Sequence, residues 1–309
     1  MEESQRLSST ARNRAKIATV LVPTDFSAES LKALRYATAL VKKFGAKLHV
    51  VHVSEIDFAV PGPASPGKAR QLSDTEVKEQ LEGMTGGSVD ATVHGRTGRA
   101  FDQICRFASE IEADLVVMST HGRTGLKRLF LGSNAERVVQ HSGSPVLVVR
   151  QSERDFVADG ALVQIQTILV PTDFSESSRE ALDYAVGFGR QFGARLVLFH
   201  SFSVPEFITT DPYGPHNIHP TPERARSAAG DQMREFVKGL DFGGVDFETQ
   251  ITMGRAADEI CDYAAKQKID LIITSTHGRT GFMHVLIGSV AEHVVRHAHS
   301  PVLIVPAKR

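Results

Sequence analysis

The 309-residue chain lacks three features that would each point to a special class of protein. Its two cysteines, Cys105 and Cys261, belong to no paired motif, so neither a disulfide framework nor a zinc knuckle is expected. No uninterrupted apolar run approaches the roughly 20 residues that a bilayer-crossing helix needs. The formal net charge of −1 is too balanced for bulk binding of nucleic acid. We therefore expect a soluble, cytoplasmic protein that binds neither membranes nor nucleic acid.

The composition is that of an ordinary globular protein, with 41% hydrophobic and 23% charged residues. A chain of this length exceeds the size at which one hydrophobic core keeps growing, so two domains are the first expectation. Residues 1–15 are polar, with glutamates at the front and no apolar stretch behind them. They are predicted to be a polar leader rather than a signal peptide.

Two sequence motifs each occur twice in the chain. Val-Leu-Val-Pro-Thr-Asp-Phe-Ser at Val20–Ser27 returns with one change at Ile168–Ser175, and Ser-Thr-His-Gly-Arg-Thr-Gly at Ser119–Gly125 returns unchanged at Ser275–Gly281. An internal repeat of this kind predicts two homologous domains. We place them at residues 16–150 and 164–309, joined by a linker at 151–163.

Within each half, short β-branched runs alternate with segments whose apolar residues recur at helical spacing. In the first half, Ile17–Val22 and Leu48–Val53 are strand-like, and Glu29–Phe44 is helical. This alternation implies crossover connections and a parallel sheet covered on both faces. Each domain is therefore predicted to be α/β and Rossmann-like, with an open, mostly parallel five-stranded sheet and helices on both faces. A single domain built on one sheet of about ten strands is the alternative, which the duplicated order of the motifs disfavours.

The last apolar run of each half, Val146–Val149 or Val302–Val305, is predicted to be an edge strand. An exposed hydrophobic edge invites pairing, and two copies in one chain can cover each other. We expect the two final strands to pack together around a pseudo-twofold axis, forming an intrachain pseudo-dimer. The sequence leaves open whether two chains also associate as a homodimer.

The segment Ser119–Ser133 carries the clearest sign of a ligand site, because it follows a predicted strand and runs into a predicted helix. Glycine allows backbone N–H groups to approach a ligand closely, and a helix N-terminus offers unpaired donors and a favourable dipole. Gly122, Gly132 and Ser133 are the expected donors to a phosphate group.

Asp25 is expected near the same edge of the sheet, because it directly follows the first strand of its domain, as Asp173 does in the second. A carboxylate there could accept a hydrogen bond from a ribose hydroxyl or an adenine amino group. The alternative is an Asx-turn or an N-cap at the start of the next helix, although Ser27 suits the capping role better.

Together these motifs resemble the universal stress protein family, in which a Pro-Thr-Asp-Phe-Ser segment follows the first strand. The family pairs it with Gly-x-x-Gly, nine residues and Gly-Ser after the fourth strand, and the spacer here is Arg123–Leu131 or Arg279–Ile287. The resemblance covers nearly the whole chain apart from the leader, the linker and the loops after the second strands. Ser119 and Ser275 stand where the pattern has its first glycine, which adds a hydroxyl group beside the expected ribose.

The resemblance implies ATP, accompanied by Mg²⁺, as the ligand. Thr24 and Asp25 would flank the base and ribose, and Val53 would contact adenine through its backbone, while Ser201 replaces this valine in the second domain. The site residues implied for the first domain are Thr24, Asp25, Val53, Ser119, Gly122, Arg123, Gly132 and Ser133. Those implied for the second are Thr172, Asp173, Ser275, Gly278, Arg279, Gly288 and Ser289.

Two other features, a glycine-containing loop and the two cysteines, are predicted to have no role in binding or catalysis. A third, a pair of histidines, is left open. Gly62–Lys68 resembles a Walker A loop, but its two prolines lack the N–H groups that such a loop needs, so a loop without phosphate is expected. Cys105 and Cys261 fall on apolar helical stripes and are expected in the core. His216 and His219 lie in a long loop, and the sequence does not decide whether they share a metal ion.

The sequence thus predicts an ATP-binding regulatory protein of the stress response that acts through its conformation or through an unidentified protein partner. No catalytic triad can be placed, so at most slow ATP hydrolysis is expected. One alternative is a scaffold that binds no nucleotide. The other is an ATP-consuming enzyme, although enzymes on this type of sheet typically carry Ser-Gly-Gly-x-Asp-Ser after the first strand.

Overall fold

The computed structural model describes residues 17–55, 70–87, 89–119, 132–150, 154–158, 162–204, 221–276 and 287–307. Several features predicted from the sequence lie outside these residues: the leader at 1–15, the Gly62–Lys68 loop, His216, His219, Gly122, Arg123, Gly278 and Arg279.

Strands and helices alternate along both halves of the chain, as the sequence predicts. The first half contains β1 (Thr19–Thr24), α2 (Ala28–Phe44), β2 (Lys47–Ser54), α3 (Asp74–Thr85), β3 (Thr92–Thr97), α4 (Ala100–Glu110), β4 (Leu115–Ser119), α5 (Ser133–His141) and β5 (Val146–Val149). The second contains β8 (Thr167–Pro171), α6 (Glu176–Phe192), β9 (Arg195–Phe202), α7 (Pro222–Val237), β10 (Phe247–Met253), α8 (Ala256–Lys266), β11 (Leu271–Ser275), α9 (Ser289–His297) and β12 (Val302–Val305).

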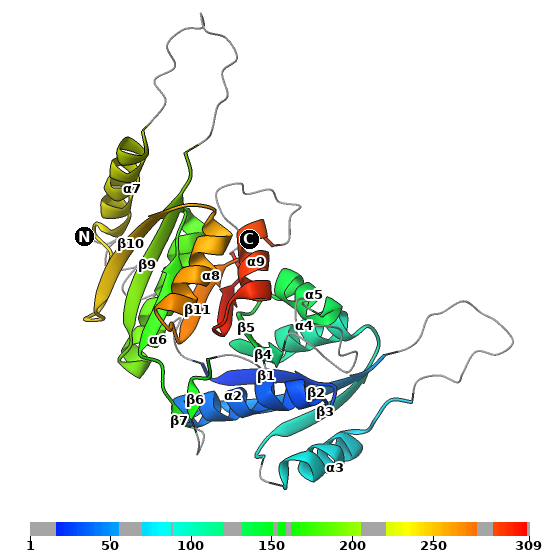
Figure 1. The fold of residues 1–309 in the computed structure, drawn as a ribbon. Helices are drawn as coiled ribbons and strands as arrows, with labels where there is room; N and C mark the ends of the chain where they lie inside the picture. Colours follow the sequence, from blue (N-terminus) through cyan, green and yellow to red (C-terminus); the bar gives the residue numbers. More distant parts are fainter. Residues whose placement is uncertain are drawn as a thin grey trace, which may run out of the picture.

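Each half forms a five-stranded sheet in which all neighbouring strands are parallel. The strand orders are β5-β4-β1-β2-β3 and β12-β11-β8-β9-β10, and helices lie on both sides of each sheet (Figure 1). The direction of the crossovers reverses between β1 and β4, and again between β8 and β11. A ligand crevice is expected at the carboxyl ends of the strands on either side of such a reversal. The predicted fold class is confirmed.

Helix α2 illustrates how local sequence signals fix the elements. Its N-cap is Ser27, whose Oγ accepts a hydrogen bond from the N–H of Ser30 at 3.2 Å. Its C-cap is Gly45, whose φ of 67° lies in the left-handed region that glycine adopts without strain. The equivalent helix α6 has Ser175 as its N-cap and Gly193 as its C-cap in the same way.

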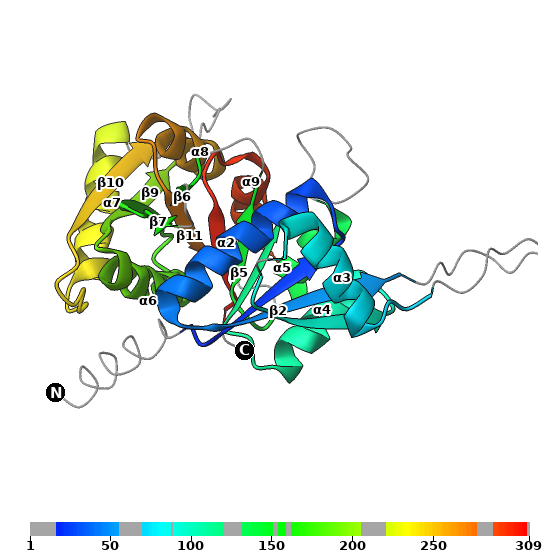
Figure 2. The ribbon, with the colours of Figure 1, turned by 90° about the horizontal axis from the view of Figure 1, so that it is seen from below.

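The side chains of each strand alternate between two apolar layers. On β1, Val20 and Val22 pack in the layer of α2 and α6, and Leu21 packs in the layer of α4, α5, α8 and α9. Figure 2 shows α2 close to α6 where the two halves meet. The contact there is aromatic, since the ring of Phe44 lies edge-on to Phe188 and Phe192 at centroid distances of 5.9 and 5.7 Å. Both layers therefore continue from one domain into the other.

The two domains join through antiparallel pairing of β5 with β12. Val148 lies opposite Val302 and Val146 opposite Ile304, while Leu147 faces its own counterpart in the repeat, Leu303. A pseudo-twofold axis therefore passes between the two leucines. The expected packing of the final strands is present, and it merges the two parallel sheets into one ten-stranded sheet.

The described part of the segment predicted as a linker packs tightly against the first domain. Phe156 is 1% exposed, and its ring meets that of Tyr36 on α2 at a centroid distance of 4.7 Å. Asp155 pairs with Arg35 on the same helix. The segment continues into the short antiparallel strands β6 (Val157–Ala158) and β7 (Leu162–Val163). It is polar in composition but is anchored by one aromatic side chain.

Arg154, the residue before Asp155 in the same segment, is bonded to the second domain. Arg154 Nε donates to Asp270 Oδ1 at 2.7 Å, and Asp270 Oδ2 accepts the N–H groups of Gln166 and Thr167 at 2.9 and 3.0 Å. Asp270 is only 5% exposed, so these bonds satisfy a carboxylate largely removed from water. Residues 154–156 thus contact both domains.

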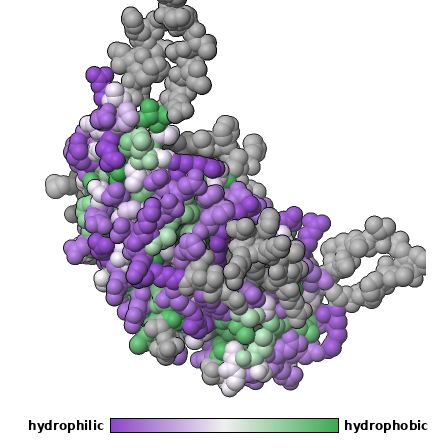
Figure 3. All heavy atoms as spheres, in the orientation of Figure 1, coloured by the Kyte–Doolittle hydropathy of each residue, from purple (hydrophilic) through white to green (hydrophobic). Residues whose placement is uncertain are grey.

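The face of the molecule in Figure 3 is mainly hydrophilic where the described residues are coloured. None of the described helices combines the length and the apolar composition that spanning a membrane requires.

The direction of each backbone group at the domain junction follows from strand geometry. The N–H of Val116 on β4 donates to the carbonyl of Pro145 at 2.9 Å, so the backbone of Pro145 faces β4. In a strand, the N–H and C=O groups of one residue point to the same side, and those of the next residue point to the other side. Leu147 therefore also faces β4, and Val148 faces β12.

Val148→Pro should loosen the junction, because proline removes the N–H group that faces β12. Leu147→Pro is the matched control, since it removes the N–H group that faces β4 within the first domain. Hydrogen exchange should quicken at Val302–Val305 in the first variant and at Leu115–Ser119 in the second. Unchanged protection of Val302–Val305 in Val148→Pro would contradict this account of the junction.

Candidate functional site

A cleft of about 500 Å³ opens in the first domain at the carboxyl ends of β1 and β4. Its walls also include the end of β2 and the first residues of α4 and α5. The structure brings together here Thr24, Asp25, Val53, Ser119, Gly132 and Ser133, which are the described members of the predicted site. The cleft lies at the reversal of the strand order, where such folds bind ligands.

Asp25 at the cleft wall sets the turn between β1 and α2. Its Oδ1 accepts the N–H of Ser27 at 3.1 Å and the hydroxyl of Ser27 at 2.6 Å. This is the Asx-turn that the sequence leaves as an alternative, and Ser27 is then held in position as the N-cap of α2. Asp25 therefore has a local structural role and also lines the cleft.

The hydroxyl of Thr24 is likewise engaged within the turn. Thr24 is 7% exposed, and its Oγ1 accepts the N–H of Phe26 at 3.0 Å and lies 3.1 Å from Ser30 Oγ. Phe26 has a φ of 60°, an uncommon conformation for a residue with a Cβ, and the bond to Thr24 helps to hold it. The side chain of Thr24 thus stabilises the turn that lines the cleft.

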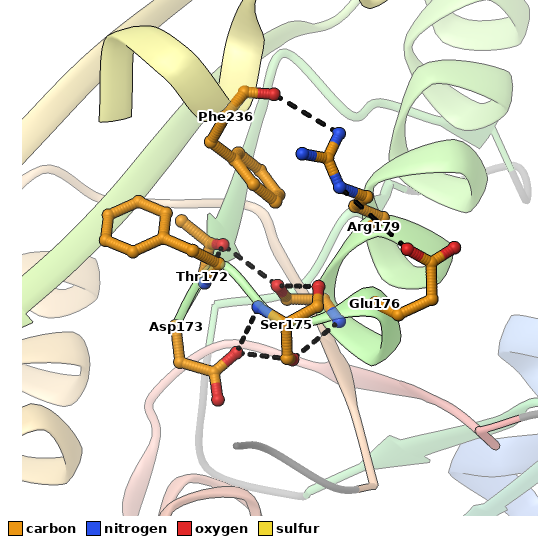
Figure 4. Close-up of polar contacts among 8 residues, drawn as sticks. Thr172, Asp173, Ser175, Glu176, Arg179 and Phe236 are labelled. Atoms are coloured by element: carbon orange, nitrogen blue, oxygen red, sulfur yellow. Dashed lines mark hydrogen bonds and ion pairs between the residues drawn. The ribbon is translucent and has the colours of Figure 1, made fainter. Parts of the chain in front are cut away.

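The second domain repeats this turn almost atom for atom (Figure 4). Thr172 Oγ1 lies 3.0 Å from the N–H nitrogen of Phe174 and 3.0 Å from Ser178 Oγ. Asp173 Oδ1 accepts the N–H and the hydroxyl of Ser175 at 3.1 and 2.5 Å. The recurrence shows that the Pro-Thr-Asp-Phe-Ser segment encodes a defined turn by itself, whatever binds beside it.

His52 at the end of β2 is a site residue that the sequence analysis missed. Its Nδ1 lies 2.9 Å from the carbonyl oxygen of Thr24, and its ring stacks on Phe26 at 4.6 Å. A carbonyl oxygen only accepts, so the proton of this hydrogen bond is on Nδ1. His200 holds Thr172 in the same way at 2.8 Å. The histidine occurs at the same position of both repeats, and this recurrence could have identified it from the sequence.

Glu55 and Asn134 form a second missed feature of the cleft. Glu55 Oε1 accepts the N–H of Ala100, the first residue of α4, at 3.2 Å and the side-chain amide of Asn134 at 3.4 Å. Asn134 is the second residue of α5. One carboxylate thus lies beside the N-termini of two helices, which favour negative charge.

The predicted phosphate donors lie at the start of α5 in the first domain and of α9 in the second. Gly132 is the N-cap of α5 and offers no side chain to cap that helix. In the second domain Gly288 is the N-cap of α9, and its N–H donates to the carbonyl of Thr276 at 2.6 Å. Ser289 follows it as the first residue of α9, and Ser275 ends β11. Ser201, which replaces Val53, donates its hydroxyl to Gly254 O at 2.8 Å.

Burial shifts the pKa of three side chains outside the lining of the cleft. Burial raises the pKa of Cys105 to about 11, with a further contribution from Asp102, so its thiol stays protonated and unreactive at neutral pH. Burial lowers the pKa of His49 and of His94, whose ring nitrogens lie 3.2 Å apart, and so favours the neutral form of both rings. Among the described residues, no three His, Cys, Asp or Glu side chains are placed to hold a metal ion.

Comparison with known proteins assigns the family. The model of the Universal stress protein family matches residues 16–150 and 164–306. A universal stress protein of Mycolicibacterium smegmatis is 26% identical over 296 residues, covering 93% of this chain and 96% of that protein. One of Methanocaldococcus jannaschii is 33% identical over 138 residues, covering 45% of this chain and 80% of that protein.

The same architecture occurs among solved structures. The crystal structure of a universal stress protein from Archaeoglobus fulgidus superposes with a TM-score of 0.60 at 22% identity, covering 93% of this chain and 95% of the other. The chain therefore belongs to the universal stress protein family and carries two copies of its domain in tandem.

Proposed function

We propose that the first domain binds ATP and that occupancy regulates the protein's conformation or its affinity for a protein partner. The cleft of about 500 Å³ carries the proposal. It combines an apolar wall, a carboxylate on the turn after β1 and the N-terminus of α5 at the reversal of the strand order. Its volume lies within the roughly 300–1,000 Å³ typical of small-molecule sites.

Each part of the nucleotide has a matching part of the cleft. The apolar side chains of Val51, Ile104 and Met118 are buried along the cleft and suit the adenine base. The phosphates would take backbone N–H groups at Gly132 and Ser133, where the dipole of α5 favours anions. Asp25 is assigned to the ribose and Val53 to the adenine edge through its backbone.

A magnesium ion fits the chemistry of the same cleft. Asp25 and Glu55 both line it, and Mg²⁺ is usually bound by one or two carboxylates together with substrate phosphates. When bound, the ion would neutralise part of the phosphate charge.

We assign weaker nucleotide binding to the second domain. Ser201 stands where the first domain has Val53, and its hydroxyl donates to the carbonyl of Gly254 at 2.8 Å. The strand end assigned to the adenine edge in the first domain is therefore built differently in the second.

A scaffold that binds no nucleotide is the second candidate. The observation that favours it is that the Thr and Asp side chains of the motif bond within the turn in both domains. The motif therefore has a structural explanation that needs no ligand, and only a binding measurement separates the two functions.

Gly132→Val should weaken ATP binding by about a hundredfold or more, because the added side chain blocks the approach of phosphate to α5. The φ and ψ of Gly132, −60° and 142°, suit valine, so the domain should still fold. Gly288→Val is the matched control in the second domain, where φ and ψ are −69° and 146°. Isothermal titration calorimetry should show strong loss only in the first variant. Equal ATP affinity in Gly132→Val and wild type would refute the assignment.

ATP hydrolysis should be far slower than the typical enzyme turnover of about 10 per second. His52, which lines the cleft, bonds through Nδ1 to a backbone carbonyl rather than to a carboxylate that would raise its basicity. Phosphate release from ATP and Mg²⁺ measures the rate. A turnover near the typical enzyme value would instead make the protein an ATPase.

A further inference from the structure

Glu55 introduces a negative charge into the part of the cleft that favours anions. The residue directly follows β2, lines the cleft, and bonds to Ala100 of α4 and Asn134 of α5. Asn134 is adjacent to Ser133, one of the two residues assigned to the phosphates. Any phosphate held at the start of α5 would therefore share its surroundings with a carboxylate.

Two opposing effects act on a polyphosphate in this arrangement. The N-termini of α4 and α5 attract anions, but Glu55 already satisfies part of that attraction and repels a second anion a few ångströms away. A divalent cation removes the conflict, because it binds a carboxylate and phosphate oxygens together. A ligand without phosphate meets no such conflict.

We propose that Glu55 makes the binding of nucleotide polyphosphates in the first domain depend on a divalent cation. Without the cation Glu55 repels the phosphates, and with it Glu55 and the phosphates share the ion. This inference rests on the proposed function and adds a selecting residue to the same site. The charge of the ligand, and not only its adenine base, then decides whether the cleft is filled.

Of the two domains, only the first has a glutamate and an asparagine at these positions. By the spacing of the repeat, Ser203 stands at the position of Glu55, and Val290 at that of Asn134. Val290 is 38% exposed at the start of α9. The two copies of the domain share the turn after their first strand and differ at this end of the cleft.

Glu55 also caps α4, and this structural role must be separated from the electrostatic one. The N-cap of α4 is Arg99, whose side chain makes no capping bond, and Glu55 accepts the N–H of the next residue, Ala100. Glu55→Gln keeps one acceptor oxygen of the same reach, removes the charge and exchanges the other oxygen for an NH2 group. Glu79→Gln, on the exposed side of α3, removes one carboxylate far from the cleft and is the matched control.

The test is calorimetric titration of the full chain with ATP, in excess Mg²⁺ and in EDTA, and with adenosine as a probe without phosphate. Glu55→Gln should bind ATP in EDTA about tenfold more tightly than wild type or Glu79→Gln does. Its affinity for ATP should then respond much less to Mg²⁺, and its affinity for adenosine should be unchanged.

An equal response of wild type and Glu55→Gln to EDTA would overturn the inference while leaving nucleotide binding intact. A parallel gain in adenosine affinity would also overturn it, since the substitution would then have reshaped the cleft. If neither protein binds ATP in either buffer, the proposed function itself is wrong and the inference falls with it.

Discussion

The antiparallel pairing of β5 with β12 determines how everything else in the molecule is arranged. Every strand of the first domain runs parallel to β5, and every strand of the second runs parallel to β12. Because these two strands are antiparallel, the carboxyl ends of the two sheets lie at opposite edges of the ten-stranded sheet. The cleft and the equivalent strand ends of the second domain therefore face opposite sides of the molecule, and one ligand cannot bridge them.

Any communication between the domains must consequently pass through the packed junction. Both apolar layers cross it, and residues 154–156 contact both domains through Phe156 and Arg154. Helix α2 begins at the turn that forms the cleft wall and ends at Phe44, which meets α6 of the second domain. A conformational change at the turn could therefore be transmitted along α2 to α6 of the second domain.

The fold was predictable because its signals are local or repeated: alternating periodicities, duplicated motifs and an apolar edge strand in each half. The site was predictable only in outline. The sequence places Asp25 and Gly132 at the same edge of the sheet, but it leaves an Asx-turn only as an alternative for Asp25 and does not reveal that Gly288 bonds to Thr276. Glu55 and Phe156 were missed because their partners lie far away in the chain, at Ala100 and Tyr36. Their roles depend on tertiary contacts that periodicity does not encode.

We propose that this duplicated fold carries one working nucleotide site, in the first domain. The turn after the first strand is the same in both domains, whereas Ser203 and Val290 of the second domain stand at the positions of Glu55 and Asn134. Native mass spectrometry of the full chain with saturating ATP and Mg²⁺ tests this claim most directly. The account predicts a dominant species with one ATP bound per chain. A chain that carries no nucleotide under these conditions would contradict it, and so would one that carries two with equal affinity.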